Sequence, residues 1–261
     1  DDDDVCASCG VAAVDDIKLK FFDDCDLVKY CSANCQENHR EQHEEECKKR
    51  KEELNDKHLF QQPDSSHIGE CPICCLPLPL HPTKSNLMSC CCKIICRGCD
   101  YANRKREDDQ GLGNRCAYCR EPVPISEEGM MKNIMKRIKK HGDPAAMIQI
   151  GKKHRNEGDY GKALEYYTKA AELGDVDAHA CLGTLYYKGE GVEKDEKKFV
   201  YHFEQAAIGG HTWGRGLLAV YEKNNGRFER AARHFIINAD LGCDGSLEEI
   251  KELFIQGIVS K

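Results

Sequence analysis

Cysteine is the residue type in this chain whose spacing most clearly indicates chemistry. The sequence of 261 residues holds 18 cysteines, and all except Cys181 and Cys243 lie between Cys6 and Cys119. Many form pairs separated by two residues, a spacing at which a tight turn presents two thiolates to one metal ion. A disulfide framework is disfavoured because the chain begins with Asp1–Asp4 and not with a signal peptide. We therefore expect zinc sites in an intracellular protein of the cytoplasm or the nucleus.

The amino-acid composition limits the kinds of partner that the chain is expected to bind. The formal net charge is −7 and the pI is near 5.9, whereas nonspecific nucleic-acid binders are usually basic. The basic runs at 48–51 and 104–106 are flanked by acidic residues, which is typical of solvated helix faces. No apolar stretch approaches the roughly 20 residues of a membrane helix. We expect protein partners, no membrane segment and no nucleic-acid site.

Changes in composition along the chain indicate the boundaries of the modules that position the cysteines. We expect a first finger at 5–50, a linker at 51–69, a second finger at 70–125, a linker helix at 126–144 and helical repeats at 145–261. The fold class that this order predicts is two small zinc-stabilised α+β fingers followed by an all-α helical-repeat solenoid.

The last region repeats itself. Ala146, Ala178, Gly214 and Ser246 occupy the same place in four related segments, at intervals of 32, 36 and 32 residues. A period in the thirties is that of one helix–turn–helix unit in a solenoid. The sequence therefore predicts stacked helix pairs, with glycines 174, 210 and 242 as left-handed helix caps.

The turn of the longest unit contains Gly189, Gly191, Val192, Asp195 and Lys198. It resembles the turn of the Sel1-like repeat, a relative of the tetratricopeptide repeat, and every position of that pattern is occupied. The resemblance implies a concave surface that holds protein partners.

The second finger contains four pairs of thiols and resembles an all-cysteine RING finger. In a RING finger the pairs interleave, so the resemblance implies that one zinc ion is held by Cys71, Cys74, Cys96 and Cys99. The other ion would be held by Cys116 and Cys119 with two of Cys90, Cys91 and Cys92, of which we favour Cys90 and Cys92. Four thiolates leave no open position on the metal, which indicates a structural role.

A RING finger implies recruitment of a ubiquitin-conjugating enzyme and ubiquitin ligation without a covalent intermediate. Ile73 matches the apolar contact of the first zinc loop, and Arg120 matches the residue that hydrogen-bonds both enzyme and ubiquitin. Two positions depart from the pattern. Ala117 stands where proline is usual, and Tyr101 is the nearest aromatic residue where tryptophan is usual. Whether the finger is active therefore stays open.

The first finger resembles a MYND finger, most specifically in the segment 29–36. The resemblance implies a first zinc site of Cys6, Cys9, Cys31 and Cys35. A second site would use Cys25, His43 and Cys47, but Phe22 stands in the place of its fourth cysteine. Substitute ligands for it are Asp23, Asp24 or His39. We therefore expect three or four zinc ions in the chain, and MYND fingers usually bind proline-containing peptides.

Two hypotheses follow for the whole chain. The leading one is a zinc-binding adaptor, a RING-type ubiquitin ligase or ligase subunit whose MYND finger and Sel1-like repeats bind client proteins. The alternative is a noncatalytic protein-binding scaffold. A metal-dependent enzyme is disfavoured because closed cysteine sites offer no position for a substrate.

Overall fold

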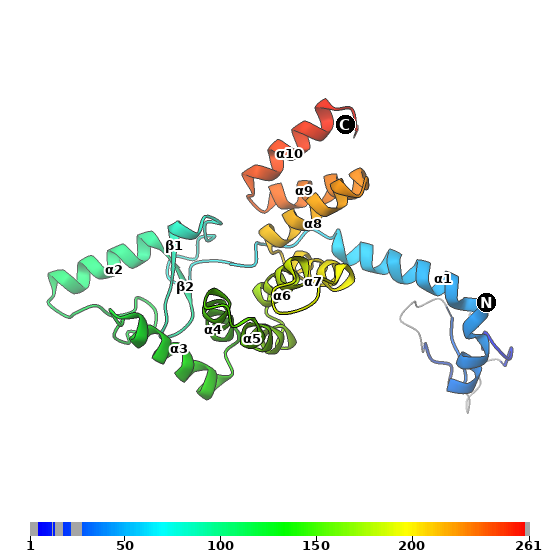
Figure 1. Cartoon of the computed structure of the whole chain (residues 1–261), viewed down its shortest axis with the longest axis horizontal. Helices are drawn as coiled ribbons and strands as arrows, with labels where there is room; N and C mark the ends of the chain where they lie inside the picture. Colours follow the sequence, from blue (N-terminus) through cyan, green and yellow to red (C-terminus); the bar gives the residue numbers. More distant parts are fainter. Residues whose placement is uncertain (1–4, 12, 14–17, 22–27, 259–261) are drawn as a thin grey trace. The chain divides into compact units, whose positions relative to one another are not determined.

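The computed structural model describes residues 5–11, 13, 18–21 and 28–258. The chain divides into two compact units, Asp1–Gln61 and Gln62–Lys261, and Figure 1 shows the elements of each. The first unit contains the first finger, and the second unit contains the second finger and the repeats. In the ranges described, no helix combines the length and the apolar character needed to cross a membrane.

The first unit is dominated by one polar helix, α1 (Ala33–Leu59). Its start is defined by Ser32, whose hydroxyl accepts the backbone N–H of Cys35 at 3.3 Å. Before the helix, the backbones of Lys20 and Tyr30 pair through two hydrogen bonds of 3.0 and 2.9 Å. The helix continues past residue 50, so part of the segment expected as a linker is helical.

The second finger has very little regular structure. A 3-10 turn, η2 (Pro82–Lys84), leads into β1 (Ser85–Leu87), which pairs antiparallel with β2 (Ile94–Cys96), and α2 (Arg97–Asp109) follows at once. Its buried core consists of Leu78, Met88, Ile95 and Ala117 together with cysteines. So small an apolar core cannot by itself hold a domain together, which leaves a need for metal ions.

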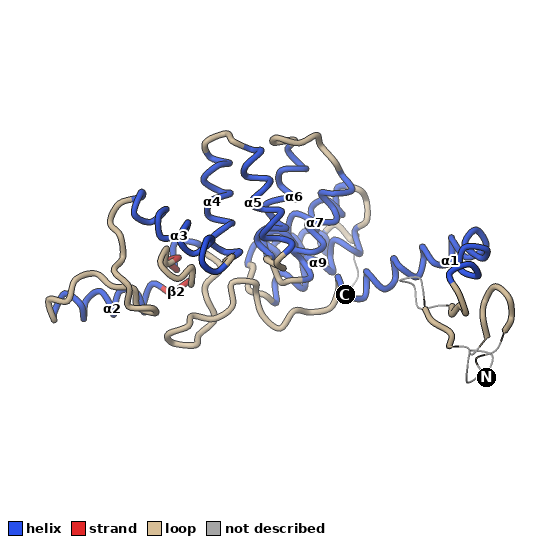
Figure 2. The backbone as a smooth tube through the Cα atoms, turned by 90° about the horizontal axis from the view of Figure 1, so that it is seen from below, coloured by secondary structure: helices blue, strands red, loops and turns tan. Residues whose placement is uncertain are grey.

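The remainder of the second unit is helical. The helices are α3 (Glu127–His141), α4 (Pro144–Asn156), α5 (Tyr160–Glu172), α6 (Val176–Lys188), α7 (Glu196–Ile208), α8 (Thr212–Asn224), α9 (Phe228–Asp240) and α10 (Asp244–Ile255). Neighbouring helices pack as pairs, with α4 against α5, α6 against α7 and α8 against α9. Figure 2 shows α4, α5 and α6 side by side. This is the predicted solenoid, and the fold class is confirmed.

The positions that recur in the sequence lie at the starts of helices. Asp143, Asp175 and His211 cap α4, α6 and α8, each accepting a backbone N–H from the third residue on. The preceding turns carry Gly174 and Gly210 with φ of 80° and 76°, the left-handed conformation expected for them. The same short signal thus starts the first helix of each pair.

A close approach within one helix pair yields a stability prediction. A methyl group added at Gly183 on α6 would lie 2.8 Å from the ring of Phe203 on α7, whereas one added at Gly216 on α8 would meet Asn238 at 3.5 Å. We expect Gly183→Ala to lower the free energy of unfolding by about 1–3 kcal/mol through overpacking. Gly216→Ala should be neutral or stabilising by up to about 1 kcal/mol. Urea unfolding followed by helical circular dichroism measures both, and equal effects would contradict the packing argument.

Buried histidines of the repeats predict how stability depends on pH. Burial lowers the pKa of His179 and His211, lowers that of His202 to about 4 and lowers that of His234 to about 3. Below the unfolded pKa of about 6.5 the unfolded chain therefore binds more protons than the folded one, so stability falls as pH falls. We expect the urea midpoint, read from the emission of the single tryptophan Trp213, to decrease from pH 7.5 to 5.5.

The control for this prediction is an exposed histidine. His202→Asn should weaken the pH dependence of the midpoint, and His141→Asn, which changes an exposed side chain, should leave it unaltered. A midpoint that rises on acidification would contradict the assignment of neutral buried histidines.

Candidate metal centres and finger surface

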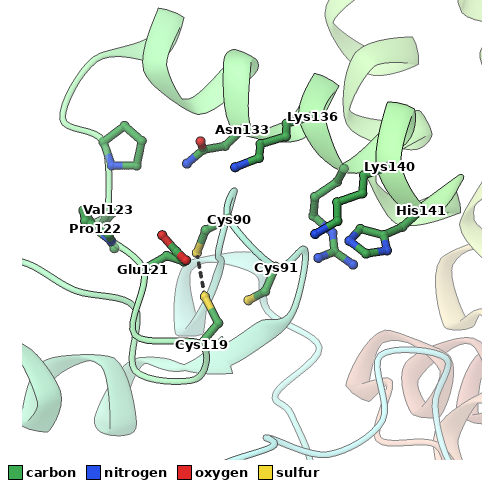
Figure 3. A pocket seen from close by; sticks show the side chains of 12 residues that line it. Cys90, Cys91, Cys119, Glu121, Pro122, Val123, Asn133, Lys136, Lys140 and His141 are labelled. Atoms are coloured by element: carbon green, nitrogen blue, oxygen red, sulfur yellow. Dashed lines mark hydrogen bonds between the residues drawn. The ribbon is translucent and has the colours of Figure 1, made fainter.

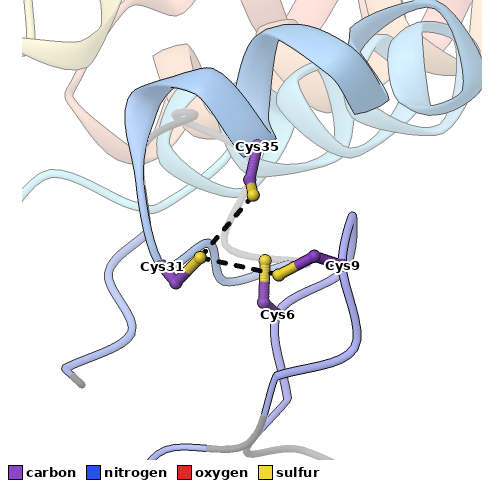
Figure 4. A group of neighbouring side chains, drawn as sticks. All are labelled: Cys6, Cys9, Cys31 and Cys35. Atoms are coloured by element: carbon purple, nitrogen blue, oxygen red, sulfur yellow. Dashed lines mark hydrogen bonds between the residues drawn. The ribbon is translucent and has the colours of Figure 1, made fainter.

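The first group of thiols joins two distant parts of the first finger. Cys6 and Cys9 lie in a turn closed by a 2.8 Å bond from the N–H of Gly10 to the carbonyl of Cys6. Cys31 precedes α1 and Cys35 lies in its first turn. All four sulfur atoms lie within 4.8 Å of one another, and Figure 4 shows them pointing toward a common centre. These are the four residues that the MYND resemblance assigns to its first site.

A second group forms in the second finger from Cys71, Cys74, Cys96 and Cys99. Cys96 ends β2 and caps α2, and its sulfur accepts the backbone N–H of Cys99 at 3.4 Å. The backbone N–H of Cys96 in turn approaches the sulfur of Cys71 at 3.5 Å. The strand-to-helix junction thus brings the first and third pairs together, in the combination that the RING resemblance assigns.

A third group consists of Cys90, Cys91, Cys116 and Cys119. Cys90 and Cys91 lie in the turn between β1 and β2, and Cys116 and Cys119 lie in the turn after α2. Cys91 is 3.8 Å from Cys116 and Cys119 is 3.3 Å from Cys90, sulfur to sulfur. Figure 3 shows Cys90 and Cys119 facing each other beside Cys91.

The sequence analysis favoured Cys92 beside Cys90, whereas the structure brings Cys91 into this group. Cys92 adopts a left-handed backbone conformation with φ of 51°, which turns its side chain out of the group. It is buried instead against Ile134, Ala146 and Ile150 of α3 and α4. Spacing alone does not distinguish three adjacent cysteines, since the backbone torsions decide where each one points.

The distances between thiols fit zinc and not disulfides. A tetrahedral ion with Zn–S bonds of about 2.3 Å separates its sulfur atoms by about 3.8 Å, whereas a disulfide bond is about 2.05 Å long. Sulfur–sulfur separations in the three groups run from 3.3 to 3.8 Å. Three groups of four thiols therefore suit the binding of several zinc ions.

Backbone N–H groups prepare one thiol of each group for metal binding. Burial opposes ionisation of Cys6, but the N–H groups of Cys9, Cys31 and Ser8 outweigh it and lower its pKa to about 6. The same balance lowers the pKa of Cys71 to about 6 and lowers that of Cys116. Crowding by other thiols raises the pKa of Cys31 to about 12. Metal binding would therefore displace the remaining protons from each group.

The second MYND site stays a prediction. Cys25, like Phe22, Asp23 and Asp24, lies outside the described residues. His43 and Cys47 are both buried on one face of α1, as two ligands of one ion require. His39, considered as a substitute ligand, is 3.1 Å from the hydroxyl of Tyr30 through its Nδ1.

The surface of the second finger exposes apolar side chains around its turns. Ile73 is 43% exposed, Leu76 is 64% exposed and Tyr118 is 47% exposed. Arg120 is half exposed, but its guanidinium donates to Asn103 on α2 at 2.6 Å and lies 3.7 Å from Glu107. The structure thus leaves Ile73 open to a partner and directs Arg120 back onto its own helix.

A group that the sequence analysis did not identify links the linker to the repeats. The Nε2 atoms of His67 and His211 lie 3.2 and 3.3 Å from the same oxygen of Asp177, and the two rings stack at 4.1 Å. Three such donors could hold a metal ion. However, the Nδ1 of His211 accepts the N–H of Gly214 at 2.9 Å, so in neutral His211 the proton sits on Nε2.

That tautomer excludes His211 as a ligand through Nε2 while it caps α8. The three residues are therefore an electrostatic clasp, in which the protonated Nε2 of His211 lies 3.3 Å from an oxygen of the Asp177 carboxylate. Although partial burial of Asp177 opposes its ionisation, His211 and His67 hold its pKa well below the usual range. No spacing signal could have found the clasp, because its members are far apart in the chain.

Comparisons with known proteins agree with two of the three modules. The family model of the MYND finger matches residues 6–47, and that of the Sel1 repeat matches residues 144–175 and 176–211. The chain contains a MYND finger and Sel1 repeats. No match to a RING family is found for the second finger.

Similar proteins share only parts of the chain. HcpC of Helicobacter pylori strain J99 is 41% identical over 56 residues, which are 22% of this chain and 19% of that protein. A Sel1-like repeat-containing protein of Schizosaccharomyces pombe is 38% identical over 63 residues, 23% of this chain and 10% of that protein. The chain thus spans less than a fifth of the length of these relatives. A solved Sel1 repeat protein from Oxalobacter formigenes is 21% identical with a TM-score of 0.47, covering 61% of this chain and 63% of that one.

The choice between Cys91 and Cys92 gives a direct prediction. Cys91→Ser should remove one zinc ion per chain, because a hydroxyl is a poor replacement for the fourth thiolate. Cys92→Ser should keep the full zinc content and only weaken packing against α3 and α4. Elemental analysis of the purified variants gives the ratio of zinc to protein, and the reverse pattern would restore the original assignment of Cys92.

Proposed function

We propose that this chain is a zinc-binding adaptor in which the second finger recruits a ubiquitin-conjugating enzyme while the MYND finger and the Sel1 repeats bind client proteins. Its general role, protein interaction by zinc-binding and repeat modules, is supported by the two family matches. The observation that carries the finer role is the interleaving of eight thiols in the second finger. Pairs one and three form one group, and pairs two and four form the other.

The two interleaved four-thiol groups, when they bind zinc, would hold two turns of the second finger at fixed positions. The first turn carries Ile73 and Leu76, and the second carries Tyr118, all three exposed. Exposed apolar side chains on such a small, rigid module favour a protein interface. Ile73 and Tyr118 would bury their side chains against the conjugating enzyme, and the finger would act by orienting that enzyme, with no covalent step of its own.

The role proposed for Arg120 requires a local rearrangement. Its guanidinium has to exchange Asn103, at 2.6 Å, for acceptors on the enzyme and on ubiquitin. The residue is half exposed, so the exchange costs little beyond one hydrogen bond, about 0.5–1.5 kcal/mol. The nearby carboxylate of Glu107 keeps the side chain oriented until the partner arrives.

Zinc has a structural part in this proposal. We propose as ligands the three described four-thiol groups and, for a second MYND ion, Cys25, His43 and Cys47. When bound, each ion holds its turn segments together and offers no open position for a substrate. Because thiolate ligands persist in a reducing compartment, we propose that the adaptor acts in the cytoplasm or the nucleus.

A noncatalytic scaffold is the second candidate. It is favoured by the engagement of Arg120 with α2 and by the lack of a match to a RING family. In a scaffold the exposed side chains of the finger would bind a protein other than a charged conjugating enzyme.

A discharge assay separates the two candidates. The zinc-loaded chain is mixed with a panel of conjugating enzymes charged with ubiquitin, and loss of the thioester is followed with time. We expect at least one enzyme to discharge faster in the presence of the chain. Ile73→Ala should reduce this acceleration about tenfold or more, which corresponds to about 1.4 kcal/mol of lost contact.

Two further variants complete the assay. Arg120→Ala should slow discharge without weakening enzyme binding, because it acts on the oriented thioester. Leu112→Ala serves as the matched control, since Leu112 is exposed to the same 43% as Ile73 but lies in the turn after α2. If no enzyme of the panel is discharged, the scaffold is the better account.

A further inference from the structure

A groove in the second unit has walls from both the second finger and the repeats. Its volume is about 660 Å³, within the range of about 300–1,000 Å³ of ligand sites. One wall comes from the finger and includes Leu80, Leu87 and Ile94, and the other comes from α4, α6 and α8 and includes Lys152, Cys181 and Trp213. The groove is therefore different from a concave face built by repeats alone.

The segment that precedes the finger contacts the repeats directly. The backbone N–H of His67 donates to the backbone carbonyl of Gly210 at 3.1 Å. The imidazole ring of His67 belongs to the clasp with Asp177 and His211. The approach at Gly210 is so close that an added methyl group would lie 2.6 Å from the carbonyl oxygen of Ser65. Both walls belong to the same compact unit, Gln62–Lys261.

One cation in the groove, Lys152, makes no close ion pair with the residues that the structure describes. The carboxylate of Asp177 faces two imidazoles, and Arg155 donates to Glu190 at 2.8 Å. Burial raises the pKa of the Cys181 thiol to about 11, so it carries no charge at neutral pH. Lys152 is exposed, and no ion pair is found for it within the described part of the chain, although its charge helps to lower the pKa of Asp177. It is a positive centre on a chain whose net charge is −7.

The side chains around this cation are mainly apolar. Trp213 is 53% exposed, and Leu80, Leu87 and Ile94 are partly buried. A single lysine without a cluster of further cations does not make a phosphate or nucleic-acid site. Apolar walls with one exposed ammonium group instead complement a chain segment that carries both apolar and acidic side chains.

We propose that this groove binds an extended acidic and apolar peptide segment of a client protein, with a carboxylate of the peptide paired to Lys152 and an apolar side chain against Trp213. The proposal rests on the adaptor function and gives its client-binding part a location. Because one wall of the groove belongs to the second finger, a client bound there would contact the finger directly.

Trp213 is the single tryptophan of the chain and reports on this groove directly. The zinc-loaded full chain is titrated with a fluorescein-labelled nine-residue peptide of alternating leucine and glutamate, and with a matched peptide in which lysine replaces glutamate. Anisotropy gives the Kd, and unlabelled peptide gives the change in tryptophan emission. We expect micromolar binding of the acidic peptide with altered Trp213 emission, and binding of the basic peptide at least tenfold weaker.

Two charge reversals test the assigned cation. Lys152→Glu should weaken binding of the acidic peptide about tenfold or more. Lys132→Glu, an equal charge change at an exposed position of α3 outside the groove, should leave the Kd within twofold. Circular dichroism verifies that both variants are folded.

Three outcomes would overturn the proposal. They are unchanged Trp213 emission at saturating acidic peptide, equal affinity for the two peptides, and equal losses in Lys152→Glu and Lys132→Glu. Because the titration contains no conjugating enzyme, its result is independent of the discharge assay. A failed discharge assay with selective peptide binding removes the ligase role alone, and the opposite result removes the groove alone.

Discussion

Coordination of metal ions by thiolates is the interaction on which the cysteine-rich half of this protein depends. The second finger has two three-residue strands and one helix, far less than a domain needs to bury a self-sufficient core. Each structural zinc ion adds about 10–16 kcal/mol of apparent binding energy at neutral pH, which exceeds what so small a core supplies. Backbone N–H groups that lower the pKa of Cys6 and Cys71 make the turns receptive to the metal.

The arrangement of these sites was largely predictable from sequence because the informative signal is local. Two cysteines separated by two residues lie in one turn, and the order of the turns along the chain indicates how they pair. The solenoid was predictable for a similar reason, since Asp143, Asp175 and His211 recur at helix starts with the period of the repeat. The exception, Cys91 in place of Cys92, depends on a left-handed backbone torsion at Cys92, which spacing does not encode.

Features made by residues far apart in the chain could not be predicted. The clasp of His67, Asp177 and His211 forms where the linker meets the repeats, and the groove beside Trp213 forms where the finger lies against them. The position of Arg120 is another case. Its place directly after the last cysteine indicated a guanidinium available to a conjugating enzyme and ubiquitin. In the structure it contacts Asn103 and Glu107 of α2 instead. Sequence motifs thus locate a residue, while packing decides whether it is available to a partner.

The three adjacent cysteines show how metal binding and packing are combined in this fold. Cys90 and Cys91 point into a thiol group, whereas Cys92 is buried with Ile134 of α3 and Ala146 of α4. The next link is Arg137, which lies beside Cys92 and donates at 2.6 Å to Asp143, the cap of α4. The turn that binds the metal is therefore also part of the core of the first repeat. Because that turn cannot change its conformation without moving Cys92, the zinc group and the start of the solenoid constrain each other.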